Sequence, residues 1–106
     1  MTAVKTKVIS LPQLNRLSPT LESTALKLME EAGELAQAIG KLRGLSGEVC
    51  AEDARTVMEK VTRELLDVAQ TAVSMMFVLE ECYGIDIEAA LDRHVQKLKA
   101  KGYLSL

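Results

Sequence analysis

The feature that most constrains the fold is a long run of apolar residues at helical spacing. They fall at alternating steps of four and three, at Leu21, Ala25, Leu28, Ala32, Leu35, Ile39 and Leu42. This spacing places them in one stripe along an α-helix. Ser18 suits the N-cap and Pro19 the first helical position, while Gly44 and Gly47 suit the end. We therefore expect a helix that begins after Ser18 and ends at Gly44.

A second long helix is predicted from about Ala51 to Cys82, after a polar loop, and Gly84 is expected to end it. At the rise of an α-helix it would be about 45 Å long, which is too long for one compact domain of this size. Between Leu65 and Leu79 it is apolar on nearly every face, which predicts burial from several sides. We expect a homo-oligomer, a dimer or a tetramer, that shares a helical core; the alternative is a tightly packed monomer with part of this helix exposed.

Shorter helices are expected at both ends of the chain. Asp86 suits the N-cap of a helix from about Ile87 to Lys101, which Gly102 would end, and a brief helix is predicted after Pro12. The chain has no Trp, one Phe and two Tyr, so its core must be aliphatic. The expected fold is a single all-α domain over residues 1–106: a small bundle of two long antiparallel helices, a C-terminal helix and a short N-terminal helix.

Several classes of partner are not expected. The formal net charge of -2 gives no basic face for nucleic acid. Cys50 and Cys82 lie far apart without a Cys-x-x-Cys motif, which argues against a zinc site or a disulfide framework and suits a reducing cytosol. The longest apolar stretch, Val68 to Leu79, is interrupted by polar residues and is too short to span a bilayer. We expect a soluble, cytoplasmic protein with no membrane or nucleic-acid partner.

Two groups of acidic residues carry the predicted chemistry. Glu31 and Glu34 lie one turn apart at the edge of the first apolar stripe, and Glu64 and Asp67 hold the same relation on the second helix. If the two helices pack antiparallel along their stripes, the four carboxylates converge. Such a group repels itself, and hard divalent cations such as Mg²⁺ or Mn²⁺ relieve the repulsion. The alternative is an ordinary solvated acidic face.

The acidic groups resemble the signature of a known enzyme superfamily. Lys-Leu-Met-Glu-Glu-Ala-Gly-Glu-Leu at 27–35 and Glu-Leu-Leu-Asp-Val at 64–68 look like the Glu-Glu-x-x-Glu … Glu-x-x-Asp motif of the MazG-like, all-α nucleoside triphosphate pyrophosphohydrolases. The tail at 94–104 is similar to the closing segment of small MazG-like proteins. The resemblance covers about residues 18–104. The 29 residues between Glu34 and Glu64 form a long spacer for this superfamily.

The resemblance implies Mg²⁺-dependent hydrolysis, with Mn²⁺ as a possible substitute, between the α- and β-phosphates of a (deoxy)nucleoside triphosphate. The products would be a monophosphate and pyrophosphate. Carried over residue by residue, it implies Glu30 as the group that orients or deprotonates the attacking water. It also implies a metal site formed by Glu31, Glu34, Glu64 and Asp67.

Three lysines are candidates for binding the substrate's phosphates: Lys27, Lys97 and Lys101. Lys27 fits equally an ion pair with Glu31, one helical turn away. Lys97 and Lys101 also suit a solvated C-terminal turn, where cations complement the helix dipole. Alternative functions are a phosphoribosyl-ATP or dUTP pyrophosphohydrolase of the same superfamily, and a non-catalytic helical interaction module.

Overall fold

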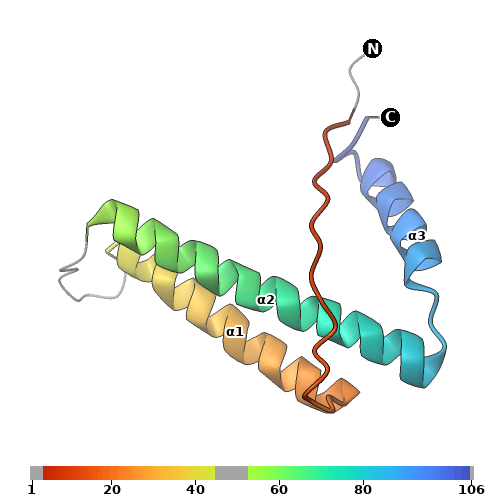
Figure 1. The fold of residues 1–106 in the computed structure, drawn as a ribbon. Coiled ribbons are helices and arrows are strands. Elements are labelled where there is room, and N and C mark those ends of the chain that lie inside the picture. Colours follow the sequence, from red (N-terminus) through yellow and green to blue (C-terminus); the bar gives the residue numbers. More distant parts are fainter. Residues whose placement is uncertain (1–3, 45–52, 106) are drawn as a thin grey trace.

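The computed structural model describes residues 4–44 and 53–105, and this part of the chain folds into three helices without a strand. They are α1 (Leu21–Leu42), α2 (Ala54–Tyr83) and α3 (Ile87–Ala100). α1 and α2 lie side by side and antiparallel, whereas α3 contacts α2 and not α1 (Figure 1). The predicted all-α architecture with two long antiparallel helices is confirmed. None of the described helices is long and apolar enough to cross a bilayer.

The start of α1 is set by a capping box two residues later than predicted. The Ser23 backbone N–H donates to Thr20 Oγ1 at 3.0 Å, and the Thr20 N–H donates to Ser23 Oγ at 2.8 Å. These reciprocal bonds satisfy two donors that a helix start leaves open. The prediction of Ser18 as N-cap and Pro19 as first helical residue was therefore wrong, because Thr20 takes the cap. Gly44 follows α1 with a φ of 69°, which a glycine adopts readily.

α2 and α3 are both capped by aspartates. Asp53 accepts a hydrogen bond from the Thr56 N–H at 2.8 Å, which holds the pKa of Asp53 below its ordinary value. Asp86 accepts one from the Ala89 N–H at 3.0 Å, as predicted. Gly84 ends α2 in the left-handed conformation. The predicted start of α2 at Ala51, and the predictions for Gly47 and Cys50, fall outside the described residues.

The predicted short helix after Pro12 is wrong, because residues 4–20 contain no helix in the structure. Side chains hold this segment extended across α2: Gln13 donates to the Glu81 carboxylate at 2.9 Å, and Gln70 donates to the Pro12 carbonyl at 2.8 Å. The residue before each of Pro12 and Pro19 is also biased towards extended backbone. The few residues left between these two prolines are too short for a stable helix.

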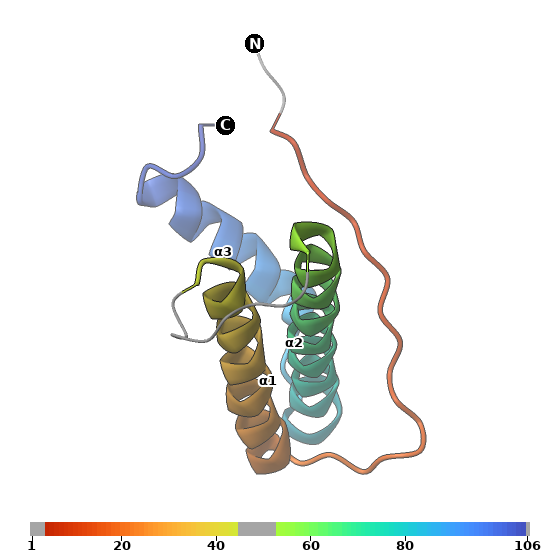
Figure 2. The same cartoon turned by 90° about the vertical axis from the view of Figure 1, so that its left-hand side faces the viewer.

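The three described helices enclose only a small core. Ala38, Val57 and Val78 are the apolar side chains buried most completely, and no side chain of residues 4–44 and 53–105 is less than 2% exposed. The radius of gyration is 17.2 Å, whereas a compact chain of about this length has one of about 13 Å. α3 and residues 4–20 project from the α1–α2 pair in the same direction (Figures 1 and 2). Leu65 and Leu66, in the part of α2 predicted to be buried from several sides, are about half exposed.

Candidate metal centre between the long helices

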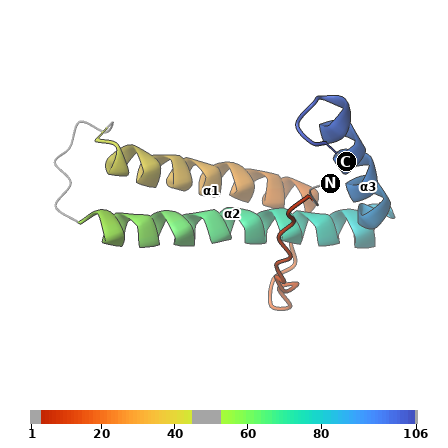
Figure 3. The ribbon, with the colours of Figure 1, turned by 90° about the horizontal axis from the view of Figure 1, so that it is seen from above.

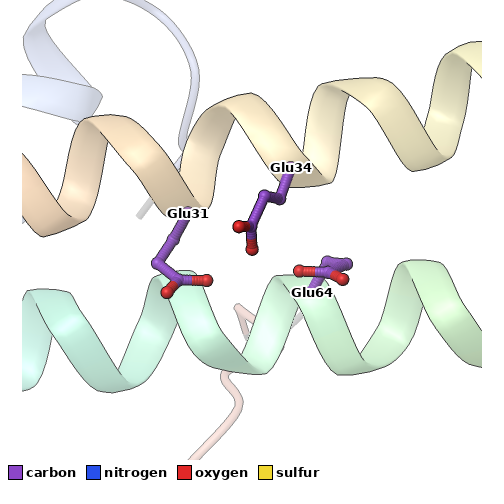
Figure 4. Close-up of side chains that lie close together, drawn as sticks. All are labelled: Glu31, Glu34 and Glu64. Atoms are coloured by element: carbon purple, nitrogen blue, oxygen red, sulfur yellow. The ribbon is translucent and has the colours of Figure 1, made fainter.

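Three carboxylates meet in the groove between the two long helices. Glu31 and Glu34 extend from α1 and Glu64 from α2, and one oxygen of each lies within 4.8 Å of the other two (Figure 4). Residues three apart on a helix project from neighbouring points on one side. The antiparallel packing then places Glu64 opposite that side. Three of the four predicted metal ligands are therefore brought together by the fold.

Burial makes this arrangement unusual for free carboxylates. Glu31 is only 6% exposed. Among the described residues, Glu31 Oε2 and Glu64 Oε2 are buried without a hydrogen-bond partner. A buried oxygen that has lost water and gained no donor destabilises the fold, and such atoms are rare in native structures. Both oxygens border the same group, and hard oxygen ligands are what Mg²⁺ and Mn²⁺ prefer, so these three residues could hold a divalent cation.

Like charges dominate the electrostatics of the group. The charge of Glu31 raises the pKa of the Glu34 carboxyl above its ordinary value; desolvation and the charge of Glu64 act in the same direction. A positively charged side chain lies at the edge of the group, since Lys27 Nζ is 3.1 Å from Glu31 Oε1. This hydrogen bond is the main cause of a raised pKa for Lys27. The lysine covers one oxygen of Glu31 and leaves the other to a further cation.

The remaining predicted site residues lie outside the group of three. The Glu30 side chain is exposed and approaches Lys27 at 3.9 Å. Asp67 is exposed one turn beyond Glu64 on α2 and does not join the 4.8 Å group. Lys97 and Lys101 lie at the end of α3, which meets the pair of long helices only at the C-terminal end of α2 (Figure 3). A single chain therefore does not bring these two lysines to the carboxylates.

A cavity of about 340 Å³ next to Lys27 was not predicted from the sequence. Leu14, Leu17 and Pro19 line one side of it, and Thr24, Thr71 and Ser74 line the other. Ser74 is only 9% exposed, and within the described part of the chain its Oγ has no hydrogen-bond partner. The cavity thus combines an apolar wall with an unpaired hydroxyl. Apart from Lys27, its residues belong to no motif, and four of its ten lining residues come from residues 4–20, where the predicted short helix does not form.

A second hollow lies on the opposite side of the carboxylates along the groove. It has a volume of about 270 Å³ and is lined by Glu34, Gln37, Ala38, Lys41, Lys60 and Glu64. Neither Lys41 nor Lys60 was among the site residues predicted from the sequence. Lys41 lies two turns after Glu34 and Lys60 one turn before Glu64, so each shares a helix face with an acid of the site. The sequence signal for Lys41 and Lys60 is this spacing of four or seven residues from an acid of the site, on the side away from Lys27.

Comparison with known protein families identifies the family of the chain. The model of the MazG nucleotide pyrophosphohydrolase domain matches residues 19–102, which include all three helices and both acidic motifs. No curated protein and no solved structure matched the chain. The match agrees with the resemblance that Glu30–Glu34 and Glu64–Asp67 indicated. The chain therefore belongs to the MazG nucleotide pyrophosphohydrolase domain family.

Proposed function

We propose that this chain is a Mg²⁺-dependent nucleoside triphosphate pyrophosphohydrolase. It would cleave the bond between the α- and β-phosphates of a (deoxy)nucleoside triphosphate and release a monophosphate and pyrophosphate. The observation that carries the proposal is the group formed by Glu31, Glu34 and Glu64, in which two buried oxygens lack a partner among the described residues. A non-catalytic interaction module would have no use for two carboxylate oxygens buried without a partner, because such oxygens lower stability.

The three carboxylates fit a divalent cation by number, ligand type and separation. Asp67 is the candidate for a fourth ligand, because it lies one turn from Glu64 on the same helix. Bound Mg²⁺ would supply electrophilic polarisation of the phosphoryl oxygens and would lower the pKa of a coordinated water. Lys27 fixes one oxygen of Glu31 and thereby orients the carboxylate towards the groove.

Glu30 is the residue we assign to accept the proton of the attacking water. Its carboxylate is exposed and contacts Lys27 at 3.9 Å, so it is free to receive a hydrogen bond from solvent. It lies directly before Glu31 in the chain and is outside the group of three. A general base must be within hydrogen-bond reach of the water, and such contacts commonly tighten only in the substrate complex.

The cavity beside Lys27 is the place where we expect the nucleoside to bind. Its volume of about 340 Å³ falls within the range of small-molecule sites, which combine apolar walls with a few polar groups. Leu14 and Leu17 offer apolar surface to a base or sugar, and the unpaired hydroxyl of Ser74 offers a hydrogen bond. Lys27 joins this cavity to the carboxylates, where the phosphates would lie.

We also propose that the active form is a homo-oligomer, either a dimer or a tetramer. The large radius of gyration and the half-exposed side chains of Leu65, Leu66 and Met76 leave an apolar surface that a second copy would cover. Such an assembly is also a route by which Lys97 and Lys101 of one copy reach the carboxylates of another. Light scattering coupled to size-exclusion chromatography measures the mass directly, and a monomer at micromolar concentration would contradict this assignment.

The function is tested by measuring pyrophosphate release from a panel of nucleotides. The panel contains the canonical ribo- and deoxyribonucleoside triphosphates, dUTP and phosphoribosyl-ATP, each with Mg²⁺, with Mn²⁺ and with a chelator. We expect metal-dependent release of pyrophosphate and a nucleoside monophosphate, and its loss in Glu64→Gln. Glu80→Gln is the matched control, because Glu80 is an exposed acid of the same helix outside the site.

The panel also separates the alternatives. Activity confined to dUTP or to phosphoribosyl-ATP would assign the chain to those narrower specificities. Release of orthophosphate in place of pyrophosphate would contradict cleavage between the α- and β-phosphates. No turnover of any nucleotide, together with no thermal shift on adding Mg²⁺ or Mn²⁺, would leave the interaction module as the better description, since a true metal site stabilises the folded state by mass action.

A further inference from the structure

The hollow between Lys41 and Lys60 has the chemistry of a phosphate site. The two ammonium groups come from facing helices, α1 and α2, and Gln37 adds an amide between them and the carboxylates. Both lysines are half-buried, and neither forms an ion pair with any acid in the described ranges. A lysine ammonium is a compact point charge that binds phosphate oxygens readily. Two ammonium groups that line one hollow can bind the same anion when it carries more than one charge.

The hollow lies directly beside the carboxylates that could hold a metal ion. Glu34 and Glu64 belong both to the metal group and to the wall of the hollow, so the two sites share an edge. An anion held by Lys41 and Lys60 would therefore lie next to a cation held by the carboxylates. The cavity beside Lys27 lies in the other direction along the same groove, because Lys27 precedes Glu31 on α1 whereas Lys41 follows Glu34.

We propose that Lys41 and Lys60 bind the β- and γ-phosphates of the substrate and hold the pyrophosphate product after cleavage. This proposal rests on the proposed function and gives the substrate a direction. The nucleoside lies towards Ser74 and Thr24, the α-phosphate lies at the carboxylates, and the terminal phosphates lie at the two lysines. The sequence order of these residues is consistent on both helices, since α1 and α2 run antiparallel.

The lysines act on the leaving group in the chemical step. The water oxygen forms a bond to the α-phosphorus and gives its proton to Glu30. The bond from the α-phosphorus to the bridging oxygen breaks, and its electron pair stays on that oxygen as pyrophosphate departs. Fixed positive charge beside the oxygens where negative charge grows stabilises the transition state more than the ground state. Lys41 and Lys60 thus contribute to turnover as well as to binding.

The competing explanation is that the two lysines only offset the negative charge of Glu34 and Glu64. In that case their removal would tighten the binding of a divalent cation and leave the affinity for pyrophosphate unchanged. A phosphate site predicts a large loss of pyrophosphate affinity when the lysines are removed, with a cation affinity that is unchanged or higher. The two explanations therefore differ in a measurement that does not involve turnover.

The test is calorimetric titration of inorganic pyrophosphate into the full chain at saturating Mn²⁺. The variants are Lys41→Met, Lys60→Met and the double substitution, with Lys99→Met as control because Lys99 is an exposed lysine of α3. We expect each single substitution to weaken pyrophosphate binding at least about tenfold and the double substitution about a hundredfold or more, as for hydrogen bonds to charged groups. Lys41→Arg and Lys60→Arg should retain part of the affinity, and Lys99→Met all of it.

The outcomes distinguish failure of the lysine site from failure of the proposed function. If the wild-type chain binds Mn²⁺ and pyrophosphate, and the double variant binds both equally well, the assignment of the two lysines is overturned while the proposed function stands. If the wild-type chain binds Mn²⁺ but no pyrophosphate, the lysine site is likewise overturned. If the wild-type chain binds no Mn²⁺ and turns over no nucleotide, the proposed function fails and this inference fails with it. Circular dichroism and a melting curve for each variant verify that it is folded.

Discussion

Replacing Glu31 by Gln tests the metal site with little change to the rest of the fold. The substitution keeps the shape of the side chain and removes one of the three converging carboxylates, the one that is only 6% exposed. It also removes the ion pair with Lys27, an exposed lysine whose contribution to stability is small. Without metal we expect a modest change in the melting temperature, because the loss of this pair is opposed by the loss of repulsion from Glu34 and Glu64.

With metal present the two proteins should differ strongly. At a Mg²⁺ or Mn²⁺ concentration about 100 times the dissociation constant, binding stabilises the wild-type fold by about 2.7 kcal/mol. For a domain of this size that is a rise of about 10–20 °C in melting temperature. Loss of a group that merely supports a ligand costs about 10–100-fold in affinity, so loss of a ligand should cost at least about 100-fold. The same metal concentration then stabilises Glu31→Gln by about 0.4 kcal/mol, or about 2–3 °C.

The assay is differential scanning fluorimetry at fixed protein concentration, because an oligomer's melting temperature depends on concentration. Each protein is measured with a chelator and over a range of Mg²⁺ and Mn²⁺. Glu80→Gln is the control and should show the full wild-type shift. A Glu31→Gln variant that gains as many degrees from the metal as the wild type would refute the reasoning, because the buried carboxylate would then not be a ligand.

Three further results are expected. Glu34→Gln should raise the melting temperature of the metal-free protein near pH 7. The pKa of Glu34 is raised in the folded state, so this carboxyl stabilises the fold at a pH below its ordinary pKa, and the stabilisation is lost as the pH rises through the raised pKa. The gain should vanish in a pH series below about pH 4. Glu30→Gln should abolish most nucleotide turnover in the pyrophosphate assay and leave Mn²⁺ affinity by calorimetry unchanged; full activity would remove its assignment as base. Asp53→Ala should lower the melting temperature at neutral pH through loss of the Thr56 hydrogen bond, and this effect should fade as the pH falls through the lowered pKa of Asp53.

The long helices could be predicted because the residues that determine them are close together in the sequence. The stripe from Leu21 to Leu42 has one period throughout, and glycines and aspartates mark helix ends by backbone geometry and side-chain capping. The boundary errors are also local. Ser18-Pro19 and Thr20-Ser23 both suit a helix start, and only the capping box of Thr20 supplies two reciprocal hydrogen bonds.

The extended N-terminal segment could not be predicted from its own residues. Its conformation depends on hydrogen bonds from Gln13 to Glu81 and from Gln70 to Pro12, whose partners are 68 and 58 residues apart in the sequence. No local pattern records such pairs. The cavity that this segment forms with α1 and α2 was missed for the same reason.

The acidic site was predicted in part because motif spacing gives the helix face but not the position along the groove. Glu31, Glu34 and Glu64 meet, whereas Asp67 lies one turn beyond the meeting point. That offset depends on how far α2 is shifted along α1, which is set by the packing of the two helices and not by the spacing within either motif. The lysines of the second hollow were missed because lysine is common on solvated helix faces and no motif marks it.

The central claim is that the three carboxylates form a cation site, and anomalous diffraction tests it most directly. Crystals of the wild-type chain grown with Mn²⁺ would be measured near the manganese absorption edge. We expect an anomalous peak between α1 and α2, within ligand distance of carboxylate oxygens from Glu31, Glu34 and Glu64. Fully occupied manganese elsewhere with none at these residues, or no manganese at all at millimolar concentration, would contradict it.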